Sequence, residues 1–444
     1  ALRDAAHYDI IDLSADFLDA SEANASAFTV QAVAGYLGML SSGGIVSIPV
    51  SIRDFPVYAL RMLATTRAAL LKAGVVDPAA HTIVYRSAWS ARILLSNQPW
   101  SAARIAAVRK FCDDRSFDVS WYPGLDPAKA RANIYNDLPA VSFARGEVTS
   151  EGTDDAIADE AAAVLAHAPT PSRDAFNLSA ITLDRPFFYA VLRLDQLGTI
   201  IKRLEILPQA EIGALVNLVV LAQAIVIALL VLLVPLVAPG RLRAPGIGLV
   251  RPIIYFPALG LGFLFIEIYL IEKASLWLND RTSGFALVLT GMLVFSGIGS
   301  MFADRLAADA RRTLAIVALV IVGWCAAMGF ASQPLILGTL DLPWLVRALL
   351  VLLTLAPVSL ALGLPFPLGL ARTGSGGFLP WAWGLNGAFS VVATPLANLI
   401  AREAGFSRVL LGAAFLYVTA LMTFPAARKT SAWQFLSTRS RAAE

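Results

Sequence analysis

The apolar residues of this chain are distributed unevenly, and this distribution limits the possible folds more than any other feature. Seven long apolar stretches fall within residues 211–427, whereas residues 1–210 contain none. The stretch from Gly213 to Pro239 has no charged residue. A helix needs about 20 apolar residues to cross roughly 30 Å of hydrocarbon. These stretches therefore predict an all-α, polytopic membrane bundle of about seven helices.

The composition agrees with a chain that occupies two environments. Hydrophobic residues make up 57% and charged residues 15% of the 444 residues, which is too apolar for one water-soluble domain. The net charge of +3 is small, and Lys and Arg cluster between the apolar stretches, as expected beside anionic lipid headgroups. We expect the lipid bilayer to be a partner and expect no nucleic acid.

The residue types that form disulfides or bind metals are few and dispersed. Cys112 and Cys325 lie in different halves of the chain, and His7, His81 and His167 lack neighbours at ligand spacing. Both cysteines are expected to be small buried residues, and no metal site is predicted.

The chain opens at Ala1 without the apolar core or cleavage site of a signal peptide. Because a strand is predicted a few residues later, we expect a longer parent sequence. We divide the chain into a partial α/β domain (1–145), a linker and interfacial segment (146–210), the bundle (211–427) and a basic tail (428–444).

The N-terminal part alternates strands and helices. Residues 7–14 and 45–50 are predicted strands, and apolar residues recur at helical spacing in residues 24–40 and 56–72. The segment Ser41–Gly44 is expected to end the first helix. This alternation predicts a parallel sheet with right-handed crossovers.

The pattern then changes to an antiparallel one. Predicted strands 82–86 and 92–96 are separated by a connection that is too short for a helical crossover. A parallel sheet that ends in an antiparallel hairpin is the C-terminal portion of the methyltransferase variant of the doubly wound fold. A helix at 101–115, with Ser101 as its N-cap, and a strand at 118–122 are predicted next.

Two later segments are predicted to lie outside this domain. The acidic, Ala-rich residues 147–168 are typical of a solvated helix or linker, and the aromatic residues within 184–189 suit a membrane interface.

Motifs in both halves carry a resemblance to a known family. They are Tyr8–Ile11, Leu40–Ile45, Asp184–Phe188, Gly262–Ile268 and Gly363–Gly369. Over most of its length the chain resembles bacterial membrane proteins that fuse a spermidine synthase-type Rossmann domain to transmembrane helices. The resemblance implies an α/β partial Rossmann domain followed by the helical bundle, in the bacterial inner (cytoplasmic) membrane.

The resemblance also implies a reaction, the transfer of an aminopropyl or methyl group. Such enzymes bind S-adenosylmethionine or its decarboxylated form over a Gly-rich turn after the first strand. No such turn follows a strand in this sequence. The fragment by itself is therefore expected to bind no cofactor. Either a preceding segment supplies the nucleotide site, or the domain has lost catalysis.

In the family, carboxylates after the strand that begins Tyr-Asp act on the attacking amine. This sequence has Asp12, Asp16 and Asp19 in that region, with Ser14 at the key place in an ungapped alignment. The resemblance therefore implies Asp12 and Asp16 as candidate catalytic bases. The alternative is a solvated carboxylate at a strand end or helix start.

Sidedness follows from the charges between the predicted spans. The spans are 213–238, 252–273, 283–303, 313–332, 343–369, 381–401 and 406–426. Lys and Arg concentrate in alternate connections, which predicts that this side is cytoplasmic. Seven crossings would then put the soluble domain outside the cell, where an S-adenosyl nucleotide is not expected. The side of the soluble domain is therefore left open.

Glu267 lies mid-span, where a carboxylate must be paired, protonated or face water. Two roles are open for it. It holds helices together, with Asn386 as its partner, or it handles a substrate or proton. Glu272 and Lys273 are expected to reach the headgroups.

Small and kink-forming residues mark two other spans. Residues 296–300 form a small-residue face suited to close helix contact. A kinked fifth span is predicted from Pro357, Pro365 and Pro367.

Three functions follow from these features. The first is the membrane-anchored transferase, and the second is a non-catalytic subunit of a larger membrane complex, with protein partners. The third, transport through the bundle, depends only on Glu267 and the Pro-rich fifth span.

Overall fold

The structure is a computed structural model. It describes residues 7–13, 26–52, 55–126, 128, 134–136, 138, 142–144, 147–149, 155–170, 172–173, 176–200, 209–237, 250–373 and 378–425. The chain forms two compact units, Ala1–Leu215 and Val216–Glu444. Asp16 and the predicted basic tail lie outside the described residues.

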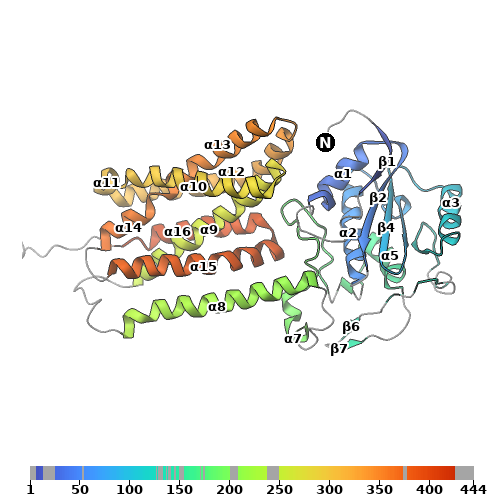
Figure 1. The fold of residues 1–444 in the computed structure, drawn as a ribbon, viewed down its shortest axis with the longest axis horizontal. Coiled ribbons are helices and arrows are strands. Elements are labelled where there is room, and N and C mark those ends of the chain that lie inside the picture. Colours follow the sequence, from blue (N-terminus) through green and yellow to red (C-terminus); the bar gives the residue numbers. More distant parts are fainter. Residues whose placement is uncertain are drawn as a thin grey trace, which may run out of the picture. The chain divides into compact units, whose positions relative to one another are not determined.

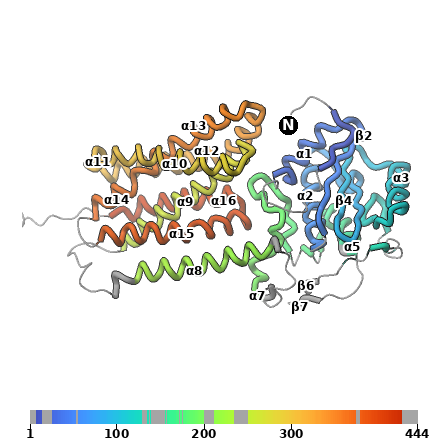
Figure 2. The backbone as a smooth tube through the Cα atoms, in the orientation of Figure 1, coloured from blue at the N-terminus to red at the C-terminus, as the bar shows by residue number. Residues whose placement is uncertain are grey.

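A five-stranded mixed sheet, with strand order β1-β2-β4-β3-β5, organises the N-terminal unit (Figures 1 and 2). The strands are β1 Tyr8–Asp12, β2 Leu40–Ser51, β3 Thr82–Arg86, β4 Ser90–Ser96 and β5 Asp118–Trp121. β1 and β2 are parallel, and every other pair in this sheet is antiparallel. The predicted parallel pair and antiparallel hairpin are confirmed. A separate antiparallel ladder joins β6 Ser142–Ala144 to β7 Glu147–Thr149.

Helices cover the two faces of the sheet unequally. They are α1 Val30–Gly38, α2 Val57–Lys72, α3 Ala102–Asp113 and α5 Ala156–Ala166. The unit also contains the short helix α7 Leu197–Ile200. α1 and α2 lie on one face of the sheet (Figure 1), as right-handed crossovers would place them. Ile48 and Ile93 belong to the hydrophobic core. On the other face, the Tyr85 ring lies 6.0 Å from the Phe111 ring of α3. Ser101 caps α3 as predicted.

The segment Ser41–Gly44 does not end α1, contrary to the prediction, but belongs to β2. Helix α1 already ends at Gly38. The pairing of β2 with β1 shifts register here, and Gly43 has a φ of +76°. A Cβ on Gly44 would lie 2.9 Å from the Tyr8 carbonyl oxygen. These glycines therefore serve the close approach of β1 and β2.

Two segments predicted to lie outside the domain are part of its core. The helix predicted as solvated is α5, whose Ile157, Ala161 and Val164 are fully buried. These residues follow the helical spacing of a buried face. Phe188, predicted at the membrane interface, packs its ring 6.0 Å from that of Tyr58 in the same core.

The C-terminal unit is helical. Its helices are α8 Gln209–Val237, which begins in the N-terminal unit, α9 Val250–Leu278, α10 Arg281–Met301, α11 Ala303–Leu306, α12 Ala310–Thr339, α13 Trp344–Leu362, α14 Pro365–Thr373, α15 Phe378–Ala404 and α16 Phe406–Met422.

Six helical segments in the described residues are long and apolar enough to cross a membrane. They are Glu211–Leu233, Val250–Leu278, Arg281–Met301, Ala303–Thr339, Trp344–Thr373 and Phe378–Ala404. The seventh predicted span forms α16, which has 17 residues and is shorter than the usual 20 or so. The structure thus supports a multi-pass membrane protein with six candidate spans.

Close backbone contact joins α10 to the kinked fifth span. The span breaks between α13 and α14, where a Cβ on Gly363 would lie 2.0 Å from the Ser296 carbonyl oxygen. A Cβ on Gly299 would lie 2.1 Å from the Leu360 carbonyl oxygen. The predicted kink is confirmed, and of the predicted small residues Ser296 and Gly299 lie at this close contact. Gly297, in contrast, has open space around its Cα.

Candidate functional site

The carboxyl edge of the sheet holds the one predicted catalytic residue that the structure describes. β1 and β2 end at this edge, and β4 begins there, because Ser51 pairs with Ser90. Asp12 is the last residue of β1 and pairs with Ser47. Asp16, its predicted companion, lies outside the described residues, so their juxtaposition stays a prediction.

Asp12 is engaged by a neighbouring strand. Its Oδ1 lies 2.5 Å from Nη1 of Arg92 on β4, and the same nitrogen donates to Ser47 Oγ at 2.7 Å. The side chains of Arg92 and Asp12 are 30% and 51% exposed, so solvent screens this ion pair. A carboxylate held in this way can still accept a hydrogen bond from an ammonium group through its second oxygen.

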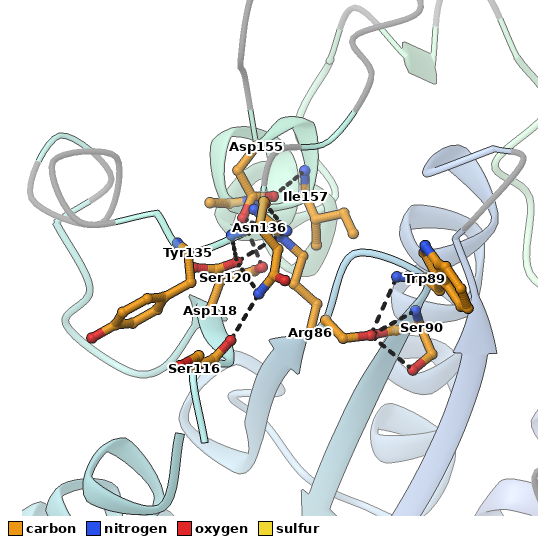
Figure 3. A network of polar contacts seen from close by, with 12 residues as sticks. Arg86, Trp89, Ser90, Ser116, Asp118, Ser120, Tyr135, Asn136, Asp155 and Ile157 are labelled. Carbon is orange, nitrogen blue, oxygen red and sulfur yellow. Dashed lines mark hydrogen bonds and ion pairs between the residues drawn. The ribbon is translucent and has the colours of Figure 1, made fainter. Parts of the chain in front are cut away.

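A second polar cluster at the same edge was not predicted from the sequence (Figure 3). Arg86, the last residue of β3, is 1% exposed. Its Nε donates to Asp155 Oδ2 at 2.7 Å, its Nη1 lies 3.2 Å from Asp118 Oδ2, and Nη1 also donates to the Asn136 carbonyl oxygen at 2.6 Å. Ser120 Oγ donates to the same Asp155 oxygen at 2.9 Å.

Both carboxylates of this cluster also bind backbone amides. Asp118 accepts from the N–H groups of Tyr135 and Asn136 at 2.6 and 2.9 Å. Asp155 is the N-cap of α5 and accepts from the N–H groups of Ile157 and Ala158. The two negative charges are therefore offset by one guanidinium, by amide donors and by the positive end of a helix. This network ties α5 and the Tyr135–Asn136 segment to the sheet, and Arg86 Nη2 is its one buried nitrogen without a hydrogen-bond partner among the described residues.

The buried network and Asp12 are not parts of one site. β2 and β4 lie between β1 and β3. At the usual spacing of strands, β1 and β3 are therefore about 14 Å apart. One sequence signal could have revealed Arg86. It shares a strand face with Thr82 and Val84, both buried, and a charge at such a position requires buried partners.

The predicted intramembrane pair is not formed. Asn386 on α15 donates through Nδ2 to the Phe256 carbonyl oxygen at 3.2 Å. Glu267 is 11 residues beyond Phe256 on α9, or about 16 Å along the helix. Glu267 is half-buried. The prediction that Asn386 is the partner of Glu267 was therefore wrong, because the two side chains are far apart along the axis of α9.

Lys273 is also placed differently from its prediction. It is buried, with Nζ 5.6 Å from the Tyr269 ring centre and 5.9 Å from that of Phe406. These contacts are cation–π interactions, made available because α9 continues to Leu278 rather than ending at Lys273.

In the part of the chain that the structure describes, no group of three or more His, Cys, Asp or Glu side chains could hold a metal ion. A scan of protein-family models and searches of curated proteins and solved structures gave no match to this chain. The family resemblance therefore stays a prediction from the motifs.

Proposed function

We propose that this chain carries the C-terminal part of a spermidine synthase-like, membrane-anchored domain that in its intact form transfers an aminopropyl or methyl group from an S-adenosyl donor. One observation carries the proposal, namely the arrangement of the strands. The parallel pair β1–β2 is followed by β4, which runs antiparallel beside β2, with β3 beyond it. The methyltransferase variant of the doubly wound sheet ends in this way.

The exposure of β1 supports the same proposal. A parallel strand in an α/β sheet is normally covered on both faces. In the described residues β1 pairs only with β2, and Ile10 is 67% exposed. A nucleotide-binding half would extend the sheet beyond β1 and bring its Gly-rich turn to the edge where Asp12 lies. The membrane we propose is the bacterial inner membrane.

Isothermal titration of the intact protein with S-adenosylmethionine and with its decarboxylated form tests the proposal. We expect saturable binding of one of the two nucleotides. Absence of binding of both would argue strongly against a transferase.

A pair of variants tests the role of Asp12. We expect Asp12→Asn to lower turnover by about 10²- to 10⁴-fold, the usual contribution of a general base, with unchanged nucleotide affinity. Asp9→Asn is the matched control, since Asp9 is an exposed aspartate of β1 on the opposite face. Equal turnover in both variants would remove Asp12 from the mechanism.

The second candidate function is that of a non-catalytic subunit in a larger membrane complex. Two observations favour it. Asp12 forms an ion pair with Arg92, and Gly43 and Gly44 allow β2 to pair closely with β1 rather than forming a nucleotide-binding turn. Purification of the protein as a lone, enzymatically active monomer would contradict this function.

A further inference from the structure

Glu267 is the one charged residue near the middle of the described spans. It lies three residues from Leu264, the midpoint of α9, or about 4.5 Å along the axis. The charged residues of the helices packed against α9 all lie near helix ends. They are Arg281 of α10, Arg311 and Arg312 of α12, Arg347 of α13, Arg372 of α14, Arg402 and Glu403 of α15, and Arg408 of α16.

The nearest charged groups on its own helix face other directions. Glu272 is five residues further on, which places it about 140° around α9 from Glu267. Lys273 is six residues further on, and at about 100° per residue it points to a different side of α9, over the rings of Tyr269 and Phe406. Residues one turn from Glu267 are apolar, namely Phe263, Leu264, Leu270 and Ile271.

The tyrosine and cysteine side chains of these spans make contacts that do not include Glu267. Tyr255 donates to the Pro365 carbonyl oxygen at 2.6 Å, and Tyr269 donates to that of Met328 at 3.1 Å. Tyr417 on α16 packs where a Cβ on Gly262 would meet its ring, and Cys325 on α12 is a buried thiol. Within the described residues, the Glu267 carboxyl group has no hydrogen bond or ion pair.

An isolated carboxylate at this depth is costly, and the cost disappears when the group takes up a proton. Because Glu267 is half-buried rather than sealed in the core, its carboxyl group can be reached from outside the helical bundle. We propose that Glu267 is an exchangeable proton-binding site in the membrane part of this protein. The site is independent of the transferase proposed for the N-terminal unit.

The test uses the full chain in liposomes and dicyclohexylcarbodiimide, a lipid-soluble reagent for protonated carboxyl groups. The carboxyl oxygen bonds to the carbodiimide carbon, and the carboxyl proton moves to a carbodiimide nitrogen. Mass spectrometry of peptides then measures modification between about pH 5 and 9. We expect Glu267 to be modified, at a rate that falls about tenfold per pH unit in the alkaline range, because the protonated fraction falls in that proportion.

Glu267→Gln is the matched control, and it should abolish this modification while other carboxyl groups react as before. Three results would overturn the proposal. No modification of Glu267 at any pH excludes an accessible protonated group. A pH-independent rate indicates a permanently protonated structural residue. Slower modification on adding sodium at constant pH indicates a site for a metal cation. If Glu267→Gln fails to fold, the pH profile of the unaltered protein still decides.

Discussion

At the scale of single residues, two arginines on neighbouring strands make ion pairs that are expected to contribute very differently to stability. Arg86 is buried with Asp118 and Asp155, whereas Arg92 and Asp12 share their pair with solvent. Removal of one partner from a buried pair leaves an uncompensated charge. Solvent supplies that compensation at the surface.

Arg86→Met should therefore destabilise the N-terminal unit by about 3–5 kcal/mol. Arg92→Met should cost at most about 1 kcal/mol. Pulse proteolysis of the full chain in increasing urea measures both free energies of unfolding. Similar losses in the two variants would show that the Arg86 network contributes no more than a surface pair.

Cys112 should be inert in the folded protein. Its side chain is fully buried, and burial raises the pKa of its thiol to about 12, with Asp113 and Asp118 acting in the same direction. Since the pKa is raised, the reactive thiolate is suppressed at pH 8, where an ordinary cysteine is partly ionised. In a Cys325→Ala background, we expect iodoacetamide to modify Cys112 only after denaturation. Rapid modification of the native protein would contradict its burial.

At the scale of secondary structure elements, backbone proximity decides which small residues matter. α10 meets the fifth span at Gly299 and Gly363, where carbonyl oxygens occupy the space of a Cβ. Gly297, only two residues away, faces open space. Small residues allow such close helix packing in membranes.

Gly299→Ala should lower the stability of the bundle by about 1–3 kcal/mol, the usual cost of overpacking. Gly297→Ala should not lower it. Thermal unfolding of both variants in the same detergent measures the difference. If Gly299→Ala is as stable as the parent protein, α10 and α13 are not in close backbone contact.

At the scale of the whole molecule, the chain combines a mixed α/β sheet unit with a bundle of membrane-length helices. The short connections of the bundle predict that consecutive spans run in opposite directions. Asp309 directly precedes α12 (Ala310–Thr339) and Asp341 follows it, so the two residues lie at opposite ends of this helix.

Single cysteines at Asp309 and Asp341, in a background without Cys112 and Cys325, should therefore be labelled from opposite sides of the membrane by an impermeant maleimide. The Asp309 side is expected to be cytoplasmic, because Arg305, Arg311 and Arg312 lie there. Labelling of both positions from one side would show that this segment does not cross.

Much of the architecture could be predicted from the sequence because its signals are local. The apolar length of a helix, the alternation in Tyr8–Lys72 and the short connection before β4 each depend on neighbouring residues. Six spans, the parallel pair and the hairpin follow from them. The conformation of Ser41–Gly44 could not be predicted, because the same glycines are compatible with a helix end and with an irregularity in a strand.

By itself, then, the sequence determined that a strand-and-helix domain precedes a set of membrane-length helices. Only the tertiary structure decided that Arg86 meets Asp118 and Asp155, that α5 is buried, and that Glu267 and Asn386 lie at different levels. These outcomes depend on partners far apart in the sequence, such as Arg86 and Asp155 (69 positions) and Phe256 and Asn386 (130 positions). Their burial and pairing energies arise only when distant segments pack together.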